Sequence, residues 1–409
     1  MKDEKQALVP RLRFPKFRDA EEWVPKKLGD KDVSEFVKKR LSLSELSLDT
    51  YVSTENILPD FGGIASASKL PPSGSFTAYK NGDILIANIR PYLRKAWVAN
   101  RSGGASNDVV VIRPKGRSNN VFLPFLLKNE VFINYVMRGA KGVKMPRGDV
   151  ALMKEYPLAL PGSDEQQKIA DCLSSLDAMI AAQVDKLDAL KTHKKGLIQQ
   201  LFPREGETVP RLRFPEFRGA GEWGETTLGQ LVDIRSGYSP SRYNLTGKAQ
   251  YPFLKVEDLN NCEKYQSSSR EYSNDELGVI PCGSVVFPKR GAAILKNKVR
   301  INSLEVLMDT NLMAITPRSS VLAEFLYYMI VAEGLSKIAD TSAIPQINNK
   351  HITPYVVRLP RKPEQKKIAD CLSSCDALIT AQVKKLKALK NHKDGLMQQL
   401  FPDVEGTMS

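Results

Sequence analysis

Residues 163–203 read SDEQQKIADCLSSLDAMIAAQVDKLDALKTHKKGLIQQLFP, and residues 362–402 read KPEQKKIADCLSSCDALITAQVKKLKALKNHKDGLMQQLFP. In both stretches apolar residues recur at alternating steps of four and three, which is the heptad spacing of a helix with a partner. Pro203 and Pro402 end the two stretches, because proline cannot continue a helix. The sequence therefore predicts two copies of one helix, each about 38 residues and roughly 57 Å long.

A lone helix of this length with one apolar face needs a partner, and the other copy is the obvious one. Antiparallel packing relates the two halves by a two-fold axis, so we expect an antiparallel coiled coil. The expected pairing residues are Ile169, Leu173, Leu176, Ile180, Leu187 and Leu190 in the first copy, and Ile368, Leu372, Cys375, Ile379, Leu386 and Leu389 in the second. Polar residues, Gln183 with Gln382 and Lys194 with Lys393, either fix the register or lie at the solvated edge.

The two helix starts carry different signals. Ser163 and Gln166 have the spacing of a capping box, with serine at the cap and glutamine at the third helical position. In the second copy we expect Pro363 at the first helical position, where a missing N–H costs nothing.

The duplication extends beyond the helices. Val9–Pro15, which reads VPRLRFP, recurs at Val209–Pro215, and Trp23 recurs as Trp223. Between these anchors the matches are faint but keep their order, with offsets that drift only from 199 to 203 residues. Near-identical copies suit a shared mechanical role, and divergent copies on one framework suit two different ligands.

The divergent parts, residues 20–161 and 219–360, lack long helical periodicity. Short apolar runs there predict strands, and one helical stretch fits each part. The strands are expected in Asp83–Ala87, Asp108–Ile112 and Gly283–Phe287, and the helices in Phe122–Arg138 and Val321–Ile338. We therefore expect an α+β chain of two similar α/β modules, each built on one compact sheet, separated by the two long helices as an internal pseudo-two-fold repeat.

The expected domain boundaries follow from this pattern. The first module with its N-terminal conserved segment takes residues 1–161, and the first helix takes 162–203. The second module with the repeated segment takes 204–360, and the second helix with a C-terminal tail takes 361–409.

The composition favours a polyanionic partner. The 409 residues carry a formal net charge of +14, and 42% of them are hydrophobic, which is enough to bury real cores. Nucleic acid is the commonest polyanion, although a merely basic protein would look the same. The charged N-terminus, Met1–Lys5, is unlike a signal peptide, and no apolar stretch of about 18 residues occurs. We therefore expect a cytoplasmic protein with no membrane contact.

Basic and amide residues gather between the predicted elements of both modules. Lysine and arginine neutralise phosphates, and arginine, asparagine and glutamine can also contact base edges. The candidate DNA-binding residues are Arg90, Tyr92, Arg94, Lys95, Lys141, Lys144 and Arg147 in the first module, and Lys289, Arg290, Lys296, Lys298, Arg300, Gln346, Asn348, Asn349 and Lys350 in the second. Most of them would equally suit a solvated surface.

Signatures of catalysis are absent from the sequence. It contains no phosphate-binding P-loop, no dinucleotide fingerprint, no Asn-Pro-Pro-aromatic motif and no Cys/His cluster with zinc spacing. We therefore expect no catalytic residues, no metal site and no cofactor.

Several junction sequences resemble those of one known family. They are Leu160–Ala170, Ile344–Ile347, Leu359–Pro360, Glu364–Ala369, Gly82–Ile86 with Ile89–Pro91, and Phe287–Gly291. Together with the repeat, they make residues 9–402 resemble the specificity subunits of type I restriction-modification enzymes.

This resemblance implies that each module is a target recognition domain that reads one half of a bipartite site in double-stranded DNA. It also implies that the helices space the half-sites and dock two methyltransferase subunits, which use S-adenosylmethionine to methylate adenine, while restriction subunits add translocation and cleavage. Two alternatives stay open at this point. A coiled-coil scaffold without sequence reading would bind DNA weakly or equally on all sequences, and a stand-alone DNA-modifying enzyme would be active as a purified chain.

Overall fold

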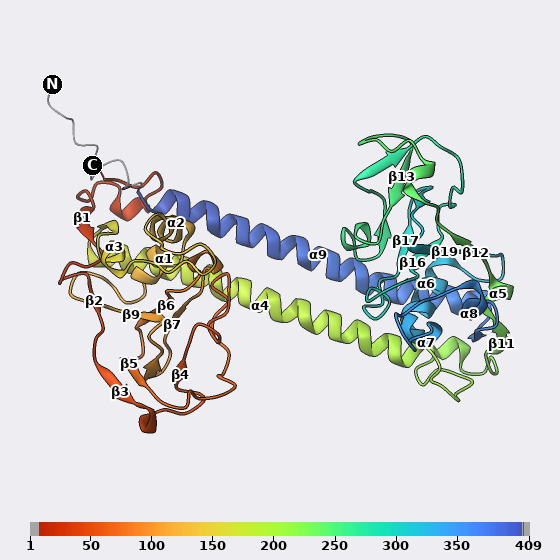
Figure 1. Ribbon diagram of the computed structural model, residues 1–409, viewed down its shortest axis with the longest axis horizontal. Coiled ribbons are helices and arrows are strands. Elements are labelled where there is room, and N and C mark those ends of the chain that lie inside the picture. The colour runs from red at the N-terminus through yellow and green to blue at the C-terminus, as the bar shows by residue number, and fades with distance from the viewer. Residues whose placement is uncertain (1–7, 403, 405–409) are drawn as a thin grey trace. The chain divides into compact units, whose positions relative to one another are not determined.

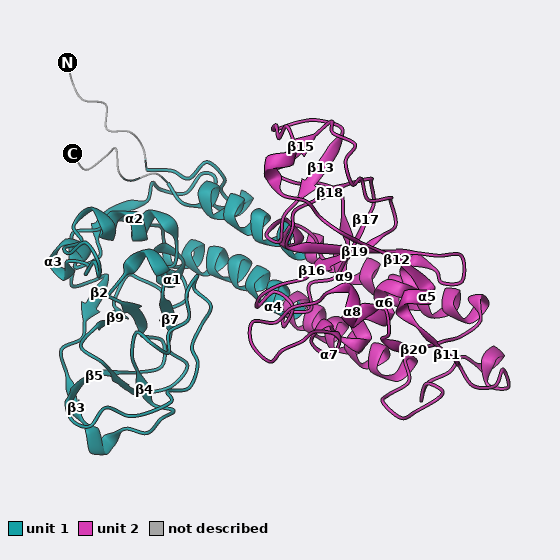
Figure 2. Cartoon of the chain, turned by 45° about the vertical axis from the view of Figure 1, so that its right-hand side comes forward, with its two compact units in different colours: residues 1–182, 386–409 teal, residues 183–385 magenta. Residues whose placement is uncertain are grey.

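The computed structural model describes residues 8–402 and 404, and their contacts divide the chain into two units. Unit 1 comprises the described residues of 1–182 and 386–409, and unit 2 comprises residues 183–385 (Figure 2). Both long helices continue from one unit into the other, so each unit holds one divergent module and a part of each helix.

Unit 1 contains two four-stranded sheets and a two-stranded ribbon (Figure 1). The sheets have the strand orders β2-β9-β6-β7 and β3-β5-β8-β4, and the ribbon pairs β1 with β10. The strands are β1 (Val24–Lys27), β2 (Ser34–Phe36), β3 (Arg40–Ser42), β4 (Tyr51–Val52), β5 (Ser75–Tyr79), β6 (Ile84–Ala87), β7 (Ala96–Val98), β8 (Gly103–Ala105), β9 (Val109–Pro114) and β10 (Pro157–Leu160).

The expectation of one sheet in each module is wrong, and β6 shows why. Ile84 and Ile86 pack into a core with the helices, whereas Leu85 packs into a second core that contains Val52 and Tyr79 of the other sheet. Successive side chains of a strand point to opposite faces. The continuous apolar run of β6 therefore belongs to a strand that is buried on both faces, with helices on one side and a second sheet on the other.

The short helices of unit 1 are α1 (Leu123–Leu127), α2 (Glu130–Arg138) and α3 (Val150–Lys154). The single helix expected over Phe122–Arg138 is therefore wrong, because the chain leaves the helical conformation at Lys128. The side chain of Asn129 then accepts a hydrogen bond from the N–H of Phe132 at 2.9 Å and starts a new helix as its N-cap.

Unit 2 repeats this plan with different strand numbers. A five-stranded sheet has the order β12-β19-β16-β17-β14, a three-stranded sheet has the order β15-β13-β18, and β11 pairs with β20. The strands are β11 (Gly224–Thr227), β12 (Val232–Ser236), β13 (Tyr251–Leu254), β14 (Tyr265–Gln266), β15 (Glu271–Ser273), β16 (Val285–Pro288), β17 (Arg300–Asn302), β18 (Leu307–Met308), β19 (Leu312–Pro317) and β20 (Val356–Leu359).

The short helices of unit 2 are α5 (Leu228–Leu231), α6 (Ala323–Glu333), α7 (Leu335–Ile338) and α8 (Asn349–Ile352). The single helix expected over Val321–Ile338 is wrong here too. It breaks at Gly334, whose φ of +81° lies in the left-handed region that glycine adopts readily.

The long helices are α4 (Ser163–Leu201) and α9 (Lys362–Leu400), each of 39 residues, and both end two residues before a proline as expected. Lys362 begins α9, so Pro363 is its second residue and not its first. Ser163 is already helical, and the N–H groups of Glu165 and Gln166 donate to the carbonyl of Gly162. The expected capping box at Ser163 is therefore wrong.

The glutamine of that motif instead joins its helix to the module. Gln166 Nε2 donates to the carbonyls of Pro161 and Arg117 at 2.9 and 2.8 Å, and its Oε1 accepts the N–H of Asn119 at 2.8 Å. The equivalent Gln365 makes the same three kinds of bond in unit 2, to Pro360, Ser320 and Leu322. The glutamine is therefore present in both copies of the helix because each unit uses it to join the helix to the module.

Within each unit the segments of α4 and α9 run antiparallel. In unit 1, Lys393 Nζ lies 2.5 Å from Asp177 Oδ1, and in unit 2, Lys194 Nζ lies 2.5 Å from Asp376 Oδ1. In unit 2, where Gln183 also contacts Gln382, rising residue numbers in α4 therefore meet falling numbers in α9. The two lysines pair with aspartates of the opposite helix and not with each other.

The glutamines of the seam do meet. Gln382 is 6% exposed, and its Nε2 donates to both the backbone carbonyl and Oε1 of Gln183, each at 2.9 Å. Because a buried amide loses free energy when it is unpaired, this contact favours one register.

All twelve of the expected pairing residues are buried or partly buried. Ile169, Leu173, Leu176, Leu187, Ile368 and Leu372 are buried, and the other six are partly exposed.

The near-identical N-terminal segments bind the helix ends. Arg13 forms two hydrogen bonds of 2.7 Å to the carboxylate of Glu165 near the start of α4, and the N–H of Leu12 donates to Gln399 near the end of α9. In unit 2, Arg213 binds Glu364 near the start of α9, and Leu212 donates to Gln200 near the end of α4. Each segment therefore holds one helix start and one helix end.

Candidate nucleic-acid interface

A seven-residue loop between α2 and α3 projects from the first module. Lys141 and Arg147 close it with two reciprocal backbone hydrogen bonds of 3.0 and 2.9 Å, and Gly142 adopts a φ of +97° inside it. The N–H of Arg90 donates to the carbonyl of Pro146 at 2.7 Å, which joins the loop to the segment after β6. The loop is therefore fixed at its base although its tip is exposed.

The second module builds the same loop from different residues. Asp340 and Gln346 close it with reciprocal bonds of 2.9 and 3.0 Å, and the N–H of Gly291 donates to the carbonyl of Pro345 at 2.9 Å. The backbone is thus conserved between the two halves of this chain, whereas Lys141 and Arg147 are replaced by an aspartate and a glutamine.

Two turns that are joined by hydrogen bonds, one of which lies beside the first loop, together hold four residues in the left-handed region. Asp60, Phe61, Arg90 and Arg94 have φ values of 54°, 56°, 51° and 52°, and the N–H groups of Asp60 and Phe61 donate to the carbonyls of Leu93 and Arg94. Such a conformation costs about 1 kcal/mol or more for each residue that has a Cβ atom, and it concentrates at functional sites. The turn between Arg90 and Arg94 presents Tyr92, which is 50% exposed.

Carboxylates hold two of the candidate arginines. Arg94 Nε donates to Asp60 Oδ1 at 2.8 Å, and Arg94 also pairs with Glu130. Arg147 pairs with Asp108. The hydrogen bond that Arg94 donates to the Asp60 carboxylate raises the pKa of the Arg94 guanidinium, so that its charge is retained. These pairs are largely exposed, and such pairs contribute only about 0–1 kcal/mol, so a DNA phosphate can replace the carboxylate at little cost.

The remaining candidates of the first module differ in accessibility. Lys144 is exposed at the loop tip, and the side chain of Lys141 is 87% exposed with its Nζ 3.9 Å from Asp149. Lys95 Nζ donates to the carbonyl of Thr54 at 2.6 Å, and Arg90 is half-buried. Lys141 and Lys144 are therefore the cations most open to a phosphate.

In the second module, Lys289 and Arg290 lie beside the equivalent loop, because the N–H of Ile347 donates to the carbonyl of Lys289 and Arg290 bridges to Gln346. Arg290 is exposed, whereas partial burial lowers the pKa of Lys289, with a smaller contribution from Arg290. Asn349 and Lys350 are exposed in α8, which follows the loop.

Other candidates of that module lie apart from the loop or are engaged in structural bonds. The side chain of Asn348 caps the start of α8. Lys298 donates to Asn260, and Arg300 in β17 donates to the carbonyl of Val299 at 2.7 Å. Lys296 is exposed, and no ion pair joins it to another residue in 8–402 or 404.

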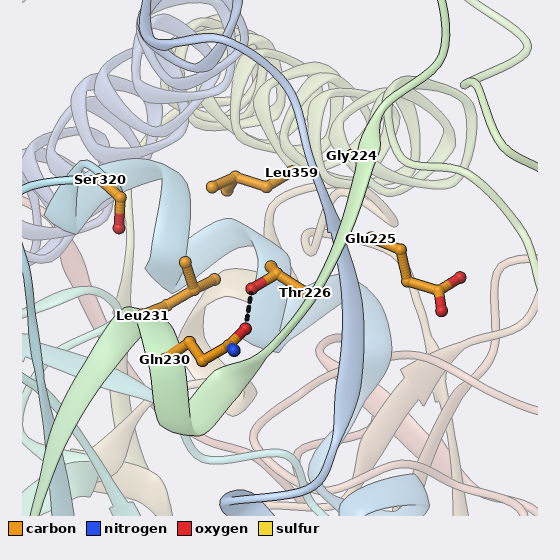
Figure 3. Close-up of a pocket in the computed structure, with 7 residues that line it drawn as sticks. All are labelled: Gly224, Glu225, Thr226, Gln230, Leu231, Ser320 and Leu359. Atoms are coloured by element: carbon orange, nitrogen blue, oxygen red, sulfur yellow. Dashed lines mark hydrogen bonds between the residues drawn. The ribbon is translucent and has the colours of Figure 1, made fainter.

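A shallow pocket in unit 2, of about 310 Å³, lies beside the β11–β20 ribbon (Figure 3). Its polar wall includes Thr226, whose Oγ1 donates to Gln230 Oε1 at 2.7 Å, and Glu225, which pairs with Arg358. These groups satisfy one another, and the wall holds no nucleophile next to a base.

Within the described part of the chain, no group of three or more His, Cys, Asp or Glu side chains could hold a metal ion. None of the helices in residues 8–402 is long and apolar enough to cross a membrane.

Comparison with known families identifies the family of the chain. The profile described as "Type I restriction modification DNA specificity domain" matches the chain twice, over residues 20–192 and 220–391. The chain belongs to this family. Each matched range covers one divergent module and most of the long helix that follows it, so the repeat found in the sequence is a repeat of the specificity domain.

Curated relatives match most of this chain, and the match covers a similar share of their own length. The type I restriction enzyme MjaVIII specificity subunit of Methanocaldococcus jannaschii is 23% identical over 320 residues, which are 74% of this chain and 74% of that subunit. The putative MjaX specificity subunit of the same organism is 24% identical over 341 residues, 78% of this chain and 77% of its own length.

Solved structures of the same kind share the fold. A chain from a type I restriction-modification system, studied for complex assembly and conformational transition, aligns with a TM-score of 0.60 at 19% identity and covers 93% of this chain and 97% of its own. The type I S subunit from M. genitalium aligns with a TM-score of 0.59 at 15% identity, over 97% of this chain and 100% of its own. The mixed α+β architecture of this specificity subunit is therefore confirmed.

The sequence analysis did not select two residues that the loops expose, Met145 and Ile344. They occupy equivalent positions, 54% and 74% exposed, and each precedes a proline. The shared apolar-proline pair was visible in the sequence, but apolar residues are ordinarily assigned to cores, and only the structure places them at the surface.

Proposed function

We propose that this specificity subunit reads a bipartite, asymmetric DNA site, with one module on each half-site. The observation that carries the proposal is the pair of equivalent loops. Loops 141–147 and 340–346 share their backbone hydrogen bonds but differ in residues that can contact bases, such as Arg147 and Gln346. Arginine suits guanine edges and glutamine suits adenine edges, so one framework carrying both supports two different half-sites.

A second, paired difference between the modules lies at the start of β6 and of its equivalent β16. In the first module Asp83 forms a bidentate pair with Arg113, and in the second the equivalent Ser284 and Thr316 share a hydrogen bond of 2.8 Å. Both members of the pair therefore differ between the two modules. In each module the two polar side chains still find a hydrogen-bond partner in each other, although the surfaces of the modules differ.

We further propose that the subunit docks two methyltransferase subunits through the outer faces of α4 and α9. Met179 in α4 and Leu378 in α9 occupy equivalent positions, and they are 47% and 57% exposed. Two equivalent exposed apolar positions support two copies of one partner. Restriction subunits would join the same complex, and the role of the helices as a spacer between half-sites stays a prediction.

In this assignment the chain contributes sequence choice and its partners contribute catalysis. The methyltransferase subunits would bind S-adenosylmethionine and methylate an adenine that is flipped out of the duplex. We place the complex in the cytoplasm, where host DNA is accessible.

Methylome sequencing of the host, with and without this gene, tests the proposal. We expect one bipartite motif to lose adenine methylation when the gene is deleted and to regain it on complementation. A methylome that is the same in both strains would contradict the proposal. Binding that is equal on all DNA sequences would instead favour a scaffold without sequence reading.

A further inference from the structure

The two loops place a large apolar side chain in solvent at the same position. Met145 is 54% exposed and Ile344 is 74% exposed, each directly before the proline whose carbonyl is hydrogen-bonded to the neighbouring segment. Val143, at the tip of the first loop, is fully exposed. A single exposed apolar residue needs no explanation, but two at equivalent positions of divergent modules indicate a shared use.

The backbone keeps these side chains away from the core. Reciprocal bonds close each loop, and the N–H groups of Arg90 and Gly291 fix Pro146 and Pro345 at 2.7 and 2.9 Å. A loop fixed at its base loses little further conformational freedom when its tip binds a ligand. The free energy gained by burying the apolar side chain therefore contributes to the binding affinity.

The charged residues around these apolar side chains indicate which kind of ligand the loops bind. The first loop carries Lys141, Lys144 and Arg147, and Lys289 and Arg290 lie beside the second. Asp149 and Asp108 lie next to Lys141 and Arg147, but Lys144 has no carboxylate within ion-pair distance among the described residues. An apolar group among cations fits a polyanion that also presents an apolar group, and duplex DNA is such a polyanion, because phosphates line its grooves and thymine adds a methyl group to the groove floor.

In duplex DNA, the apolar group presented in the major groove is the C5-methyl of thymine. We propose that Met145 and Ile344 each contact a thymine methyl in the major groove of their own half-site. This inference rests on the proposed function, and it assigns base contacts to two residues that carry no charge.

The test uses the full-length chain, purified from its host together with the subunits that accompany it. Selection from a pool of random-sequence duplexes gives its preferred site. Each thymine of that site is then replaced by uracil, which pairs identically but lacks the methyl group. We expect one position in each half-site to lose about fourfold in affinity, since one buried methyl contributes about that much.

The variants Met145→Ala and Ile344→Ala identify the partner of each methyl. Met145→Ala should weaken binding about tenfold and abolish the uracil effect in one half-site, while the uracil effect in the other half-site persists. Ile344→Ala should do the reverse. Neither variant should change the salt dependence of binding, because no phosphate contact is lost. Val131→Ala and Leu304→Ala, at positions 52% and 50% exposed outside the loops, are the matched controls.

The outcomes separate the two claims. If the wild-type complex selects no sequence, the proposed function fails. If it selects a bipartite site but the uracil effects are absent, or remain in both loop variants, sequence reading stands and the apolar contact is overturned.

Discussion

The salt bridge between Arg13 and Glu165 indicates that the duplicated N-terminal segments stabilise the starts of the long helices. The two side chains are 6% and 3% exposed, and Arg13 also donates to the carbonyls of Ala20 and Glu21 at 2.8 Å. Arg13→Ala would leave the Glu165 carboxylate buried without its cation. Breaking a buried pair in this way costs about 3–5 kcal/mol.

The second copy predicts a smaller loss for Arg213→Ala. Glu364 Oε1 also accepts the indole N–H of Trp223 at 3.2 Å, whereas Trp23 Nε1 is buried with no hydrogen-bond partner among the described residues. Glu364 would therefore keep one donor after its arginine is removed. We expect a cost of about 2 kcal/mol, which is the first loss reduced by one hydrogen bond to a charged group.

Hydrogen exchange with peptide resolution measures both losses separately. Arg13→Ala should reduce protection at the start of α4 by roughly a hundredfold or more, and leave the start of α9 unchanged. Arg213→Ala should affect the start of α9, and less strongly. Arg18→Ala, at an exposed position in the same segment, is the control.

A double replacement sharpens the interpretation. Replacing Arg13 and Glu165 together by methionine removes both charges, and the cost should be smaller than that of Arg13→Ala alone. Equal protection in Arg13→Ala and Arg18→Ala would refute the claim that Arg13 holds the start of α4, and so would a larger loss from Arg213→Ala than from Arg13→Ala.

Three further predictions concern the helices and the DNA face. Met179→Glu should lower the number of methyltransferase subunits that co-purify with the chain, as measured by native mass spectrometry. The Met179→Glu/Leu378→Glu double variant should retain none of them, and full occupancy in that variant would argue against these docking faces. Lys144→Ala should weaken DNA binding on all sequences alike and lower the slope of log K against log salt by about one, and an unchanged slope would mean that it contacts no phosphate. Gln382→Ala removes the two hydrogen bonds to Gln183. It should lower the free energy of local opening, measured by hydrogen exchange in the adjoining turns of α4 and α9, by about 1 kcal/mol. Unchanged exchange there would show that the pair does not secure the register.

The fold was largely predictable because its strongest signals are periodic and duplicated. The heptad spacing of the long helices and their terminal prolines predicted α4 and α9, and the repeat predicted two modules of one kind. The second sheet of each module was not predictable in the same way. Its strands are very short, such as β4 with two residues, and so short a stretch carries no alternation that could be recognised.

The candidate site was only partly accessible from the sequence, because its geometry depends on residues distant in the chain. Asp60 and Glu130 lie far from Arg94 in sequence, yet both bind it. Asn348 has the composition of a base-reading residue, but its position before a short helix makes it a cap. The density of basic residues in the sequence therefore pointed to the loops that the structure exposes, while accessibility within them required the structure.

Exchange of one module tests the central claim most directly. Residues 20–161 are replaced by the first module of another specificity subunit, and the methylated motif is mapped by genome-wide methylation sequencing. Independent reading predicts that one half of the motif changes and that the half read by residues 219–360 stays the same. A motif that changes in both halves, or in neither, would contradict it.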